Sequence, residues 1–197
     1  MSRMSKKKVI AITGSMGSGK SKVSEILSQK YPVTDCDQIN SLLLQKGNEG
    51  YFSLISKPYI HLLASGEIDK VAMASAMFAD PSIKKEVESI LHPLIFEEIG
   101  KWVRKQKENL VFVEVPILFE IHAEKKFDEV WCVVCDEKIA LDRLQKYRHI
   151  PEKEAKARLN CQMSVEEKIS KSQVVLYNNG LVSDLEKEIE KELERMK

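Results

Sequence analysis

Short apolar runs recur along the chain, and helical patterns separate them. Runs of this length, bounded by turn residues, are typical of buried strands. In the segments between them, apolar residues return every three or four positions, as on one face of a helix. Strands that alternate with helices predict an α/β fold, here a five-stranded parallel sheet with helices on both faces. The expected strands are residues 8–13, 32–35, 110–115, 130–135 and 174–177.

The interval between the second and third expected strands is too long for a single crossover, which needs only about a dozen residues. Residues 36–109 are therefore expected to hold a helical insertion. Helix starts are predicted at Asp69, at Asp80-Pro81 and at His92-Pro93, because these residue types favour the N-cap and the first helical position. An apolar stripe follows the last of these starts, at Ile95, Ile99, Trp102 and Val103.

A predicted helix over residues 137–147 is followed by a polar, basic stretch, residues 148–172. Two interpretations of this stretch stay open: a solvated helical surface, which includes Lys168, or a mobile basic lid over phosphates. The chain closes with another helix, whose start is predicted at Ser183 because Ser183 and Glu186 form the capping-box pattern. The buried face of this helix is expected at Leu185, Ile189, Leu193 and Met196.

Composition and charge limit which binding partners and which cellular compartment are expected. The chain has 197 residues with a formal net charge of +1, so no global field attracts nucleic acid or a membrane surface. No apolar run approaches the ~18 residues of a membrane-spanning helix, and residues 9–12 are too short for the core of a secretory leader. We therefore expect a cytoplasmic protein that binds neither nucleic acid nor membrane.

The four cysteines do not form a metal pattern. Cys132 and Cys135 have C-x-x-C spacing, but they lie in an expected strand, where positions three apart point to opposite faces. No second pair completes a zinc site. We expect core cysteines rather than metal ligands or a redox pair.

The strongest chemical signal is residues 14–21, Gly-Ser-Met-Gly-Ser-Gly-Lys-Ser, which fit the phosphate-loop pattern G-x-x-x-x-G-K-[ST] at every fixed position. An expected strand precedes the pattern and an expected helix follows it, which is the context that such a loop requires. Glycines let backbone N–H groups turn inward toward phosphate oxygens, and the helix N-terminus adds positive potential. Lys20 would reach the β- and γ-phosphates, and the Ser21 hydroxyl would bind Mg²⁺.

Acidic residues at two strand ends suggest the reaction. Asp35 and Asp37 stand where the second strand ends; one could orient Mg²⁺ through water and the other accept a proton from an attacking hydroxyl. A turn with two solvated aspartates is the alternative. Glu114 ends the third strand, and the lone His92 is most simply a cap or surface residue. The absence of Asn-Lys-x-Asp argues against a GTPase-like protein.

Several motifs, taken together, resemble the dephospho-CoA kinase family, the last enzyme of coenzyme A synthesis. These are residues 14–21, Asp-Cys-Asp at 35–37, Leu-His-Pro-Leu-Ile at 91–95, Glu-Val-Pro-Ile-Leu-Phe-Glu at 114–120, and Asn-Asn-Gly at 178–180. The basic stretch adds Arg143, Arg148, Arg158 and Gln162. The sequence departs from the family's usual pattern at Ser41, Lys70, Gln173 and Tyr177.

The resemblance implies ATP-dependent phosphorylation of the ribose 3′-hydroxyl of dephospho-CoA, with Mg²⁺, by a monomer or weak homo-oligomer. It implies catalytic roles for Asp37, Lys20 and Arg148, and metal roles for Ser21 and Asp35. It implies nucleotide contacts from Gly14, Gly17, Ser18, Gly19, Lys20, Ser21, Lys22, Arg148, Asn178 and Asn179. It implies substrate contacts from Asp37, Phe78, His92, Glu114, Leu118 and Arg158.

The same resemblance divides the chain into a nucleotide-binding core, a substrate insertion and a lid. The core would comprise residues 1–37, 108–147 and 173–197, the insertion residues 38–107, and the lid residues 148–172. Two other functions stay open from the residues alone: a kinase for another small hydroxyl or nucleotide acceptor, and a non-enzymatic nucleotide-switch protein.

Overall fold

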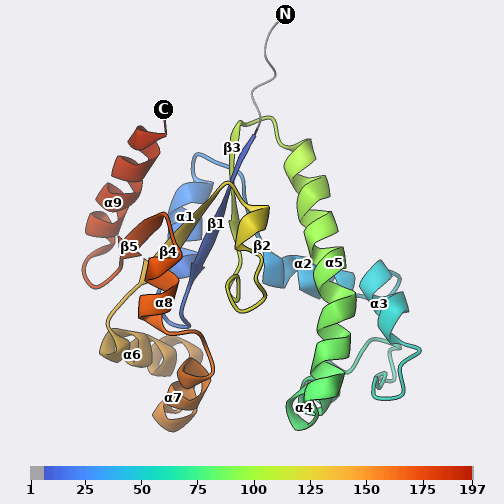
Figure 1. The fold of residues 1–197 in the computed structure, drawn as a ribbon. Helices are drawn as coiled ribbons and strands as arrows, with labels where there is room; N and C mark the ends of the chain where they lie inside the picture. The colour runs from blue at the N-terminus through green and yellow to red at the C-terminus, as the bar shows by residue number, and fades with distance from the viewer. Residues whose placement is uncertain (1–6, 197) are drawn as a thin grey trace, which may run out of the picture. The chain divides into compact units, whose positions relative to one another are not determined.

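The computed structural model describes residues 7–196, and the chain divides into two compact units (Figure 1). The first unit comprises the chain up to Thr34 and from Gln106 onward, and the second comprises Asp35–Lys105. Residues 1–6 and 197 lie outside the described residues, whereas residues 9–12, which the leader argument concerned, lie within them. No described helix is long and apolar enough to cross a membrane.

The first unit is built on a parallel sheet, as the apolar runs predict. The strand order is β2-β3-β1-β4-β5, so that the first strand lies in the middle. In the register, Ile12 lies opposite Glu114 on one side and opposite Trp131 on the other. The carboxyl ends of these strands therefore lie at one edge. The strands are β1 (Lys8–Gly14), β2 (Val33–Asp35), β3 (Leu110–Glu114), β4 (Glu129–Val134) and β5 (Val174–Tyr177).

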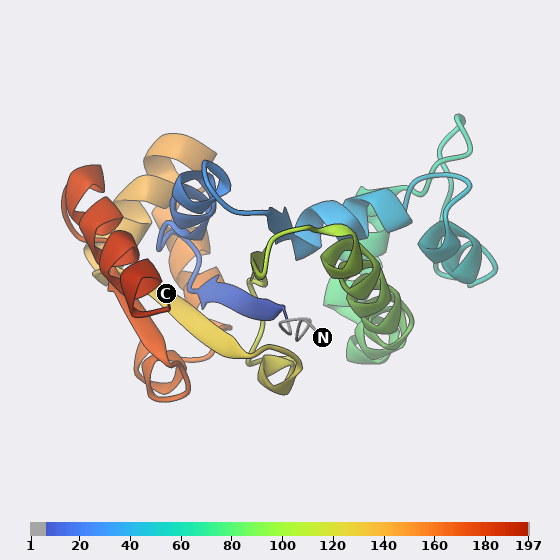
Figure 2. The same cartoon turned by 90° about the horizontal axis from the view of Figure 1, so that it is seen from above.

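Helices cover both faces of this sheet. Figure 2 shows α1 (Lys20–Ser28) and α9 (Val182–Arg195) on one face, and α8 (Val165–Ser170) and the short 3₁₀ helix η1 (Glu124–Lys126) on the other. The remaining helices of the unit are α6 (Glu137–Arg148) and α7 (Glu152–Asn160). The core beneath α1 and α9 includes Ile10, Ile12, Val23, Leu27, Phe112, Trp131, Val133, Leu185, Ile189 and Leu193.

The second unit is helical. It contains α2 (Cys36–Leu43), α3 (Glu49–Leu54), α4 (Lys70–Ala79) and α5 (Pro81–Lys105), and α5 packs against the other three. The two aspartate caps are confirmed. The Asp69 carboxylate accepts bonds from the N–H groups of Val71 and Ala72, and Asp80 accepts one from Ser82 N–H at 2.7 Å.

The predicted helix start at His92-Pro93 is wrong, because both residues lie inside α5. Proline removes the N–H that would bond to the Ser89 carbonyl and costs about 3 kcal/mol in a helix interior. The apolar stripe outweighs that cost, because it continues at four-residue spacing across the proline. The buried members of the stripe are Val87, Leu91, Ile95 and Ile99.

The capping box predicted for the last helix is also wrong. That helix begins at Val182 with Leu181 at its N-cap and no side-chain cap, although its buried face is as expected. A capping box does form at the start of α8, where the Ser164 hydroxyl accepts from Glu167 N–H and the Glu167 carboxylate accepts from Ser164 N–H. The same residue pattern occurs at both places but forms the box at only one of these two, so the pattern alone does not fix where a helix begins.

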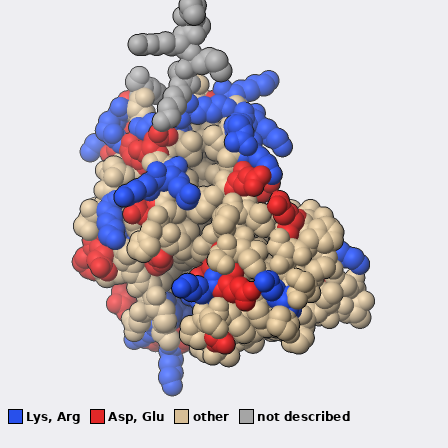
Figure 3. All heavy atoms as spheres, turned by 45° about the vertical axis from the view of Figure 1, so that its right-hand side comes forward, with Lys and Arg blue, Asp and Glu red and all other residues tan. Residues whose placement is uncertain are grey.

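The surface charge is as the sequence predicts, but the prediction of core cysteines is confirmed only for Cys36 and Cys132, because Cys135 is half-buried and Cys161 is exposed. All four cysteines are free thiols, and Cys132 is buried in β4 while Cys135 follows the end of the strand. Burial raises the pKa of both these thiols, so they are protonated near neutral pH. On the face drawn in Figure 3, basic and acidic side chains both occur, in keeping with the net charge of +1.

Candidate functional site: a phosphate loop in the first unit

The phosphate loop connects β1 to α1, and two of its glycines cannot be replaced without displacing neighbours. Gly14 has φ +147°, and a Cβ there would lie 2.2 Å from the Val133 carbonyl oxygen. Gly19, the N-cap of α1, has φ +98°, and its Cβ would lie 2.0 Å from Asn178 Nδ2. A side chain at either position would clash with atoms of the first unit, so the loop must be built from glycine.

Lys20 lies under the loop with its ammonium group held by the loop's own carbonyls. Its Nζ donates to Gly14 O at 2.9 Å and to Ser15 O at 3.0 Å. Burial lowers the pKa of Lys20 to about 8; the Glu114 carboxylate opposes this shift, and the charges of Lys168 and Arg148 add to it. An anion bound in the loop would offset the desolvation of this cation.

Arg143 and Asn178 hold the loop in place from α6 and from the end of β5. Asn178 Nδ2 donates to the Ser18 carbonyl at 2.9 Å, and Arg143 Nη1 donates to the same oxygen at 3.3 Å. Arg143 Nη2 also donates to the Asn178 carbonyl at 3.0 Å. Asn179 bonds instead to Asp136, accepting from its N–H at 2.8 Å. Direct nucleotide contacts from Asn178 and Asn179 therefore stay predictions.

Two buried hydroxyls beside the loop are orphaned. Thr13 Oγ1 and Ser18 Oγ are buried and have no hydrogen-bond partner among residues 7–196. Buried polar atoms are almost always paired, so an orphan at a glycine-rich loop points to a ligand group. Glu114, at the end of β3, is satisfied within the protein, because its carboxylate accepts from Ser24 Oγ at 2.6 Å. The donors of this loop fit the oxygens of a bound phosphate chain.

A cavity of about 480 Å³ opens beside the phosphate loop. Its volume falls in the range of small-molecule sites. Ser15 and Met16 of the loop line it, together with apolar residues such as Leu159 and Ile169. Polar groups reach it from Asp136 and Asn179. The lining of this cavity is therefore both polar and apolar.

The basic residues of the stretch 148–172 have different surroundings. Arg148 is exposed at the end of α6, and Arg158 forms an ion pair with Glu154 on its own helix. The interpretation of this stretch as a solvated surface is wrong for Lys168, because the Lys168 side chain is fully buried. Within the loop's own helix, Ser21 is exposed and Lys22 pairs with Glu25.

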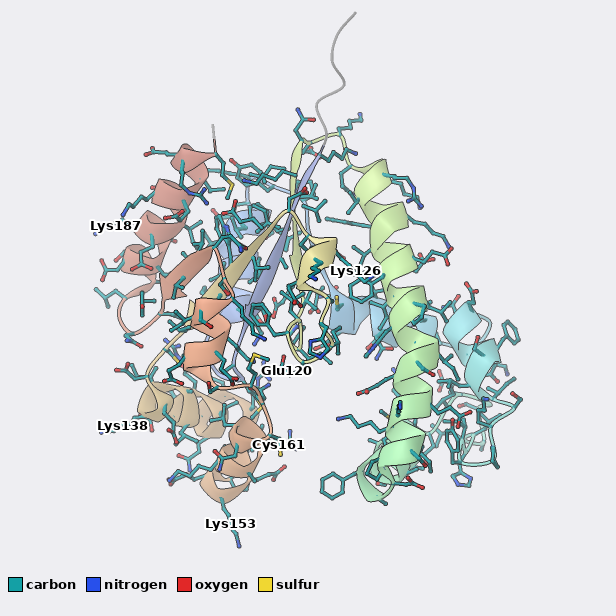
Figure 4. The ribbon with its side chains drawn as sticks, in the orientation of Figure 1. Glu120, Lys126, Lys138, Lys153, Cys161 and Lys187 are labelled. Carbon is teal, nitrogen blue, oxygen red and sulfur yellow. The ribbon has the colours of Figure 1, made fainter. Side chains whose placement is uncertain are left out.

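Half-buried Glu120 and fully buried Lys168 form an ion pair that sequence reasoning missed. Lys168 Nζ lies 2.9 Å from Glu120 Oε1, and the same oxygen accepts from Met163 N–H at 3.1 Å. Burial alone would raise the pKa of Glu120, but these bonds outweigh it and the pKa is lowered. Figure 4 labels Glu120 in the loop after β3 and Cys161 at the end of α7, the region that this carboxylate tethers.

Removing the Glu120 carboxylate should destabilise the fold. Glu120→Ala leaves the buried Lys168 charge without a partner, which costs about 3–5 kcal/mol. The double variant Glu120→Ala/Lys168→Met removes both charges and should recover most of that loss. Urea unfolding midpoints of the three proteins provide the measurement. Equal midpoints for the parent and Glu120→Ala would show that the pair contributes nothing to stability.

The second unit carries most of the remaining predicted side chains. Asp35 is the N-cap of α2, and its carboxylate accepts from Asp37 N–H at 2.7 Å. Phe78 on α4 is 94% exposed, whereas His92 on α5 is half-buried, and burial lowers its pKa against the opposing Glu88 carboxylate. Leu118, in the first unit, is fully buried. Substrate contacts from Phe78, His92 and Leu118 stay predictions.

The fold and the phosphate loop define the class of this protein: a P-loop kinase-like α/β protein. A profile described as dephospho-CoA kinase matches residues 8–184. The dephospho-CoA kinase of Geobacter sulfurreducens is 35% identical over 187 residues, which cover 92% of this chain and 95% of the relative. The chain therefore belongs to the dephospho-CoA kinase family, whose members are kinases that phosphorylate a hydroxyl group.

Two solved structures have the same architecture. A Thermus thermophilus protein has a TM-score of 0.85 at 30% identity, with 98% of this chain and 99% of that one covered. A dephospho-CoA kinase from Campylobacter jejuni has a TM-score of 0.71 at 26% identity, with 96% and 97% covered. The likeness extends over both units, so the helical second unit is part of the shared architecture rather than an addition peculiar to this chain.

Proposed function

We propose that this protein transfers the γ-phosphoryl group of ATP to the ribose 3′-hydroxyl of dephospho-CoA, giving coenzyme A and ADP. Membership of the family supports this reaction, and the phosphate loop with its glycine geometry is the single observation in the structure that carries it. The bond between the β–γ bridging oxygen and the γ-phosphorus breaks as the 3′-oxygen bonds to phosphorus. The hydroxyl proton leaves with a base, and ADP keeps the bond's electron pair.

The loop would supply most of the charge neutralisation. Phosphoryl transfer needs alignment and electrostatic stabilisation more than covalent help from the protein. In the proposal, the amides of residues 14–21 and Lys20 hold the phosphates, and Arg148 reaches them from the end of α6. The cavity beside the loop would take the adenine ring, with Asn179 at its polar edge.

The acidic pair would act on the acceptor hydroxyl and the metal. In the proposal Asp37 orients the hydroxyl and accepts its proton, and Asp35 binds Mg²⁺ through water together with the Ser21 hydroxyl. Hydroxyl and carboxylate oxygens are suitable ligands, because Mg²⁺ keeps several waters and otherwise binds one or two protein oxygens and phosphates. When bound, Mg²⁺ would neutralise charge on the phosphate oxygens. The position of Asp35 at the end of β2 in the same sheet supports this proposal.

The second unit would hold dephospho-CoA. Phe78 offers a large exposed aromatic surface and His92 a polar edge, and from the first unit Glu114, Leu118 and Arg158 complete the proposed substrate set. We also propose that the protein acts in the cytoplasm as a monomer or weak homo-oligomer. Its four free thiols are in keeping with a reducing compartment.

A coupled assay tests the reaction. ADP release should depend on dephospho-CoA and should be slow when shikimate, a sugar or a nucleotide replaces it. Fast turnover of one of those acceptors would favour the alternative of another small-molecule kinase. A slow rate that no acceptor accelerates would favour a nucleotide-switch protein.

Arg148→Ala should lower the rate of phosphoryl transfer more than it weakens ATP binding. Arg148 is exposed in this structure, so its phosphate contact would form mainly as the reaction complex closes, and such contacts affect kcat. Single-turnover rates and ATP titrations provide the two measurements, with the exposed Lys146→Ala on the same helix as the control. A variant that lost only ATP affinity would instead make Arg148 a ground-state contact.

A further inference from the structure

The phosphate loop touches the segment between α7 and α8 through one polar bond. Met16 N–H, a backbone donor of the loop, bonds to Oε1 of Gln162 at 3.0 Å. Phosphate loops use such N–H groups to bind phosphate oxygens. Here one of them already has a side-chain acceptor, which comes from a residue 146 positions further along the chain.

Gln162 is held in this place from both sides. Its own N–H bonds to the Leu159 carbonyl at the end of α7, at 3.0 Å. The next residue, Met163, donates to Glu120, which is also the partner of buried Lys168 on α8. The contact with the loop therefore belongs to an anchored turn and not to a free surface side chain.

Apolar packing supports the same contact. The Met16 side chain packs on a small core of Leu141, Leu144 and Ala155, which joins α6 to α7. Movement of the turn away from the loop would expose part of this core, whereas rotation of the Gln162 side chain alone would not. The cheapest way to free Met16 N–H is therefore to turn the Gln162 amide away while the turn stays in place.

We propose that Gln162 and a nucleotide phosphate compete for Met16 N–H, so that Gln162 is a positioning residue that releases the loop when ATP binds. The proposal rests on the proposed ATP site. A phosphate oxygen is a charged acceptor and makes a bond roughly twice as strong as a neutral amide oxygen does. Bound phosphate therefore displaces the Gln162 amide from Met16 N–H, and the bond between Gln162 and Met16 is lost.

The proposal predicts opposite effects for two substitutions of one residue. Gln162→Ala removes the competitor, and ATP should bind roughly 2- to 10-fold more tightly, the usual range for one net hydrogen bond. Gln162→Glu places a carboxylate on the same N–H, where it bonds more strongly and repels phosphate. ATP should then bind about tenfold more weakly or worse. Adenosine, which has no phosphate, should bind all variants equally.

Calorimetric titration with ATP and with adenosine, in the absence of dephospho-CoA, measures these affinities. Gln145→Ala, an exposed glutamine on α6, is the matched control and should behave as the parent. If Gln162→Ala binds ATP no better than the parent, the competition does not exist and the bond is structural. If adenosine affinity changes as much as ATP affinity, the effect lies in the cavity and the proposal also fails. If the parent and Gln145→Ala bind no ATP, the phosphate-loop site itself is wrong.

Discussion

Replacing Lys20 by alanine should slow phosphoryl transfer by about 100- to 1,000-fold. The structure holds the Lys20 ammonium group under the loop, bonded to the Gly14 and Ser15 carbonyls, so the cation is already positioned at the loop. Charge develops on the phosphate oxygens in the transition state, and a preorganised donor at such a place contributes about 3–4 kcal/mol. Alanine removes that donor but leaves the glycine geometry of the loop intact.

The measurement is single-turnover formation of coenzyme A at saturating ATP. Lys30→Ala is a suitable control, because Lys30 is an exposed lysine just past the end of α1, and its ion pair with Glu190 is long, at 3.9 Å. Both variants should unfold at the same urea concentration as the parent to within the error of the method. If Lys20→Ala turns over at a rate within a few-fold of the parent's, the assignment of residues 14–21 as a phosphate loop is wrong.

The fold could be predicted from the sequence wherever the signal was local. The five strands appear as short apolar runs, and Asp69 and Asp80 cap helices where an aspartate precedes a helical pattern. The failure at Pro93 has a physical cause. A capping residue or a proline reports a local preference worth up to about 3 kcal/mol, and packing of a long apolar stripe outweighs it. The unbroken four-residue spacing from Val87 to Ile99 is the sequence signal that would have indicated a single helix, and the start predicted at His92-Pro93 overlooked it.

The candidate site, like the fold, could be predicted from the sequence where its residues are neighbours along the chain. The phosphate loop is a contiguous motif, so eight neighbouring residues were enough to identify it. The contacts that hold the loop come from distant parts of the chain: Arg143 and Asn178 on the Ser18 carbonyl, and Gln162 on Met16 N–H. No local pattern distinguishes buried Lys168 from the solvated lysines around it, because its counter-ion Glu120 lies 48 positions earlier, which only the tertiary fold brings near.

Asp37→Asn should lower the rate of the chemical step by roughly 100- to 10,000-fold while ATP binding survives. The size of the side chain is kept, but asparagine cannot accept the proton of the ribose hydroxyl, and general base catalysis usually contributes a factor of this size. The phosphate loop lies elsewhere in the sequence and is unchanged by the substitution. ATP affinity close to that of the parent, with a slow single turnover, is the expected combination.

Asp35→Asn is the informative partner of this variant. The Asp35 carboxylate caps α2 by accepting from Asp37 N–H, and asparagine is an equally good N-cap, so the helix should keep its start. If Asp35 binds Mg²⁺ through water, a higher Mg²⁺ concentration should recover part of the lost rate of Asp35→Asn and none of that of Asp37→Asn. Asp69→Asn, at the N-cap of α4, is the control for losing a capping charge.

Single-turnover phosphorylation of dephospho-CoA by these three variants, across a Mg²⁺ series, separates the roles. A nearly normal Asp37→Asn beside an Asp35→Asn that is inactive at every Mg²⁺ concentration would mean that the two roles are reversed. If neither substitution changes the rate, the acidic pair only caps α2, and the base must be sought at Glu114. That carboxylate ends β3 and accepts from the Ser24 hydroxyl at 2.6 Å, and it is the next acidic group in the first unit to test.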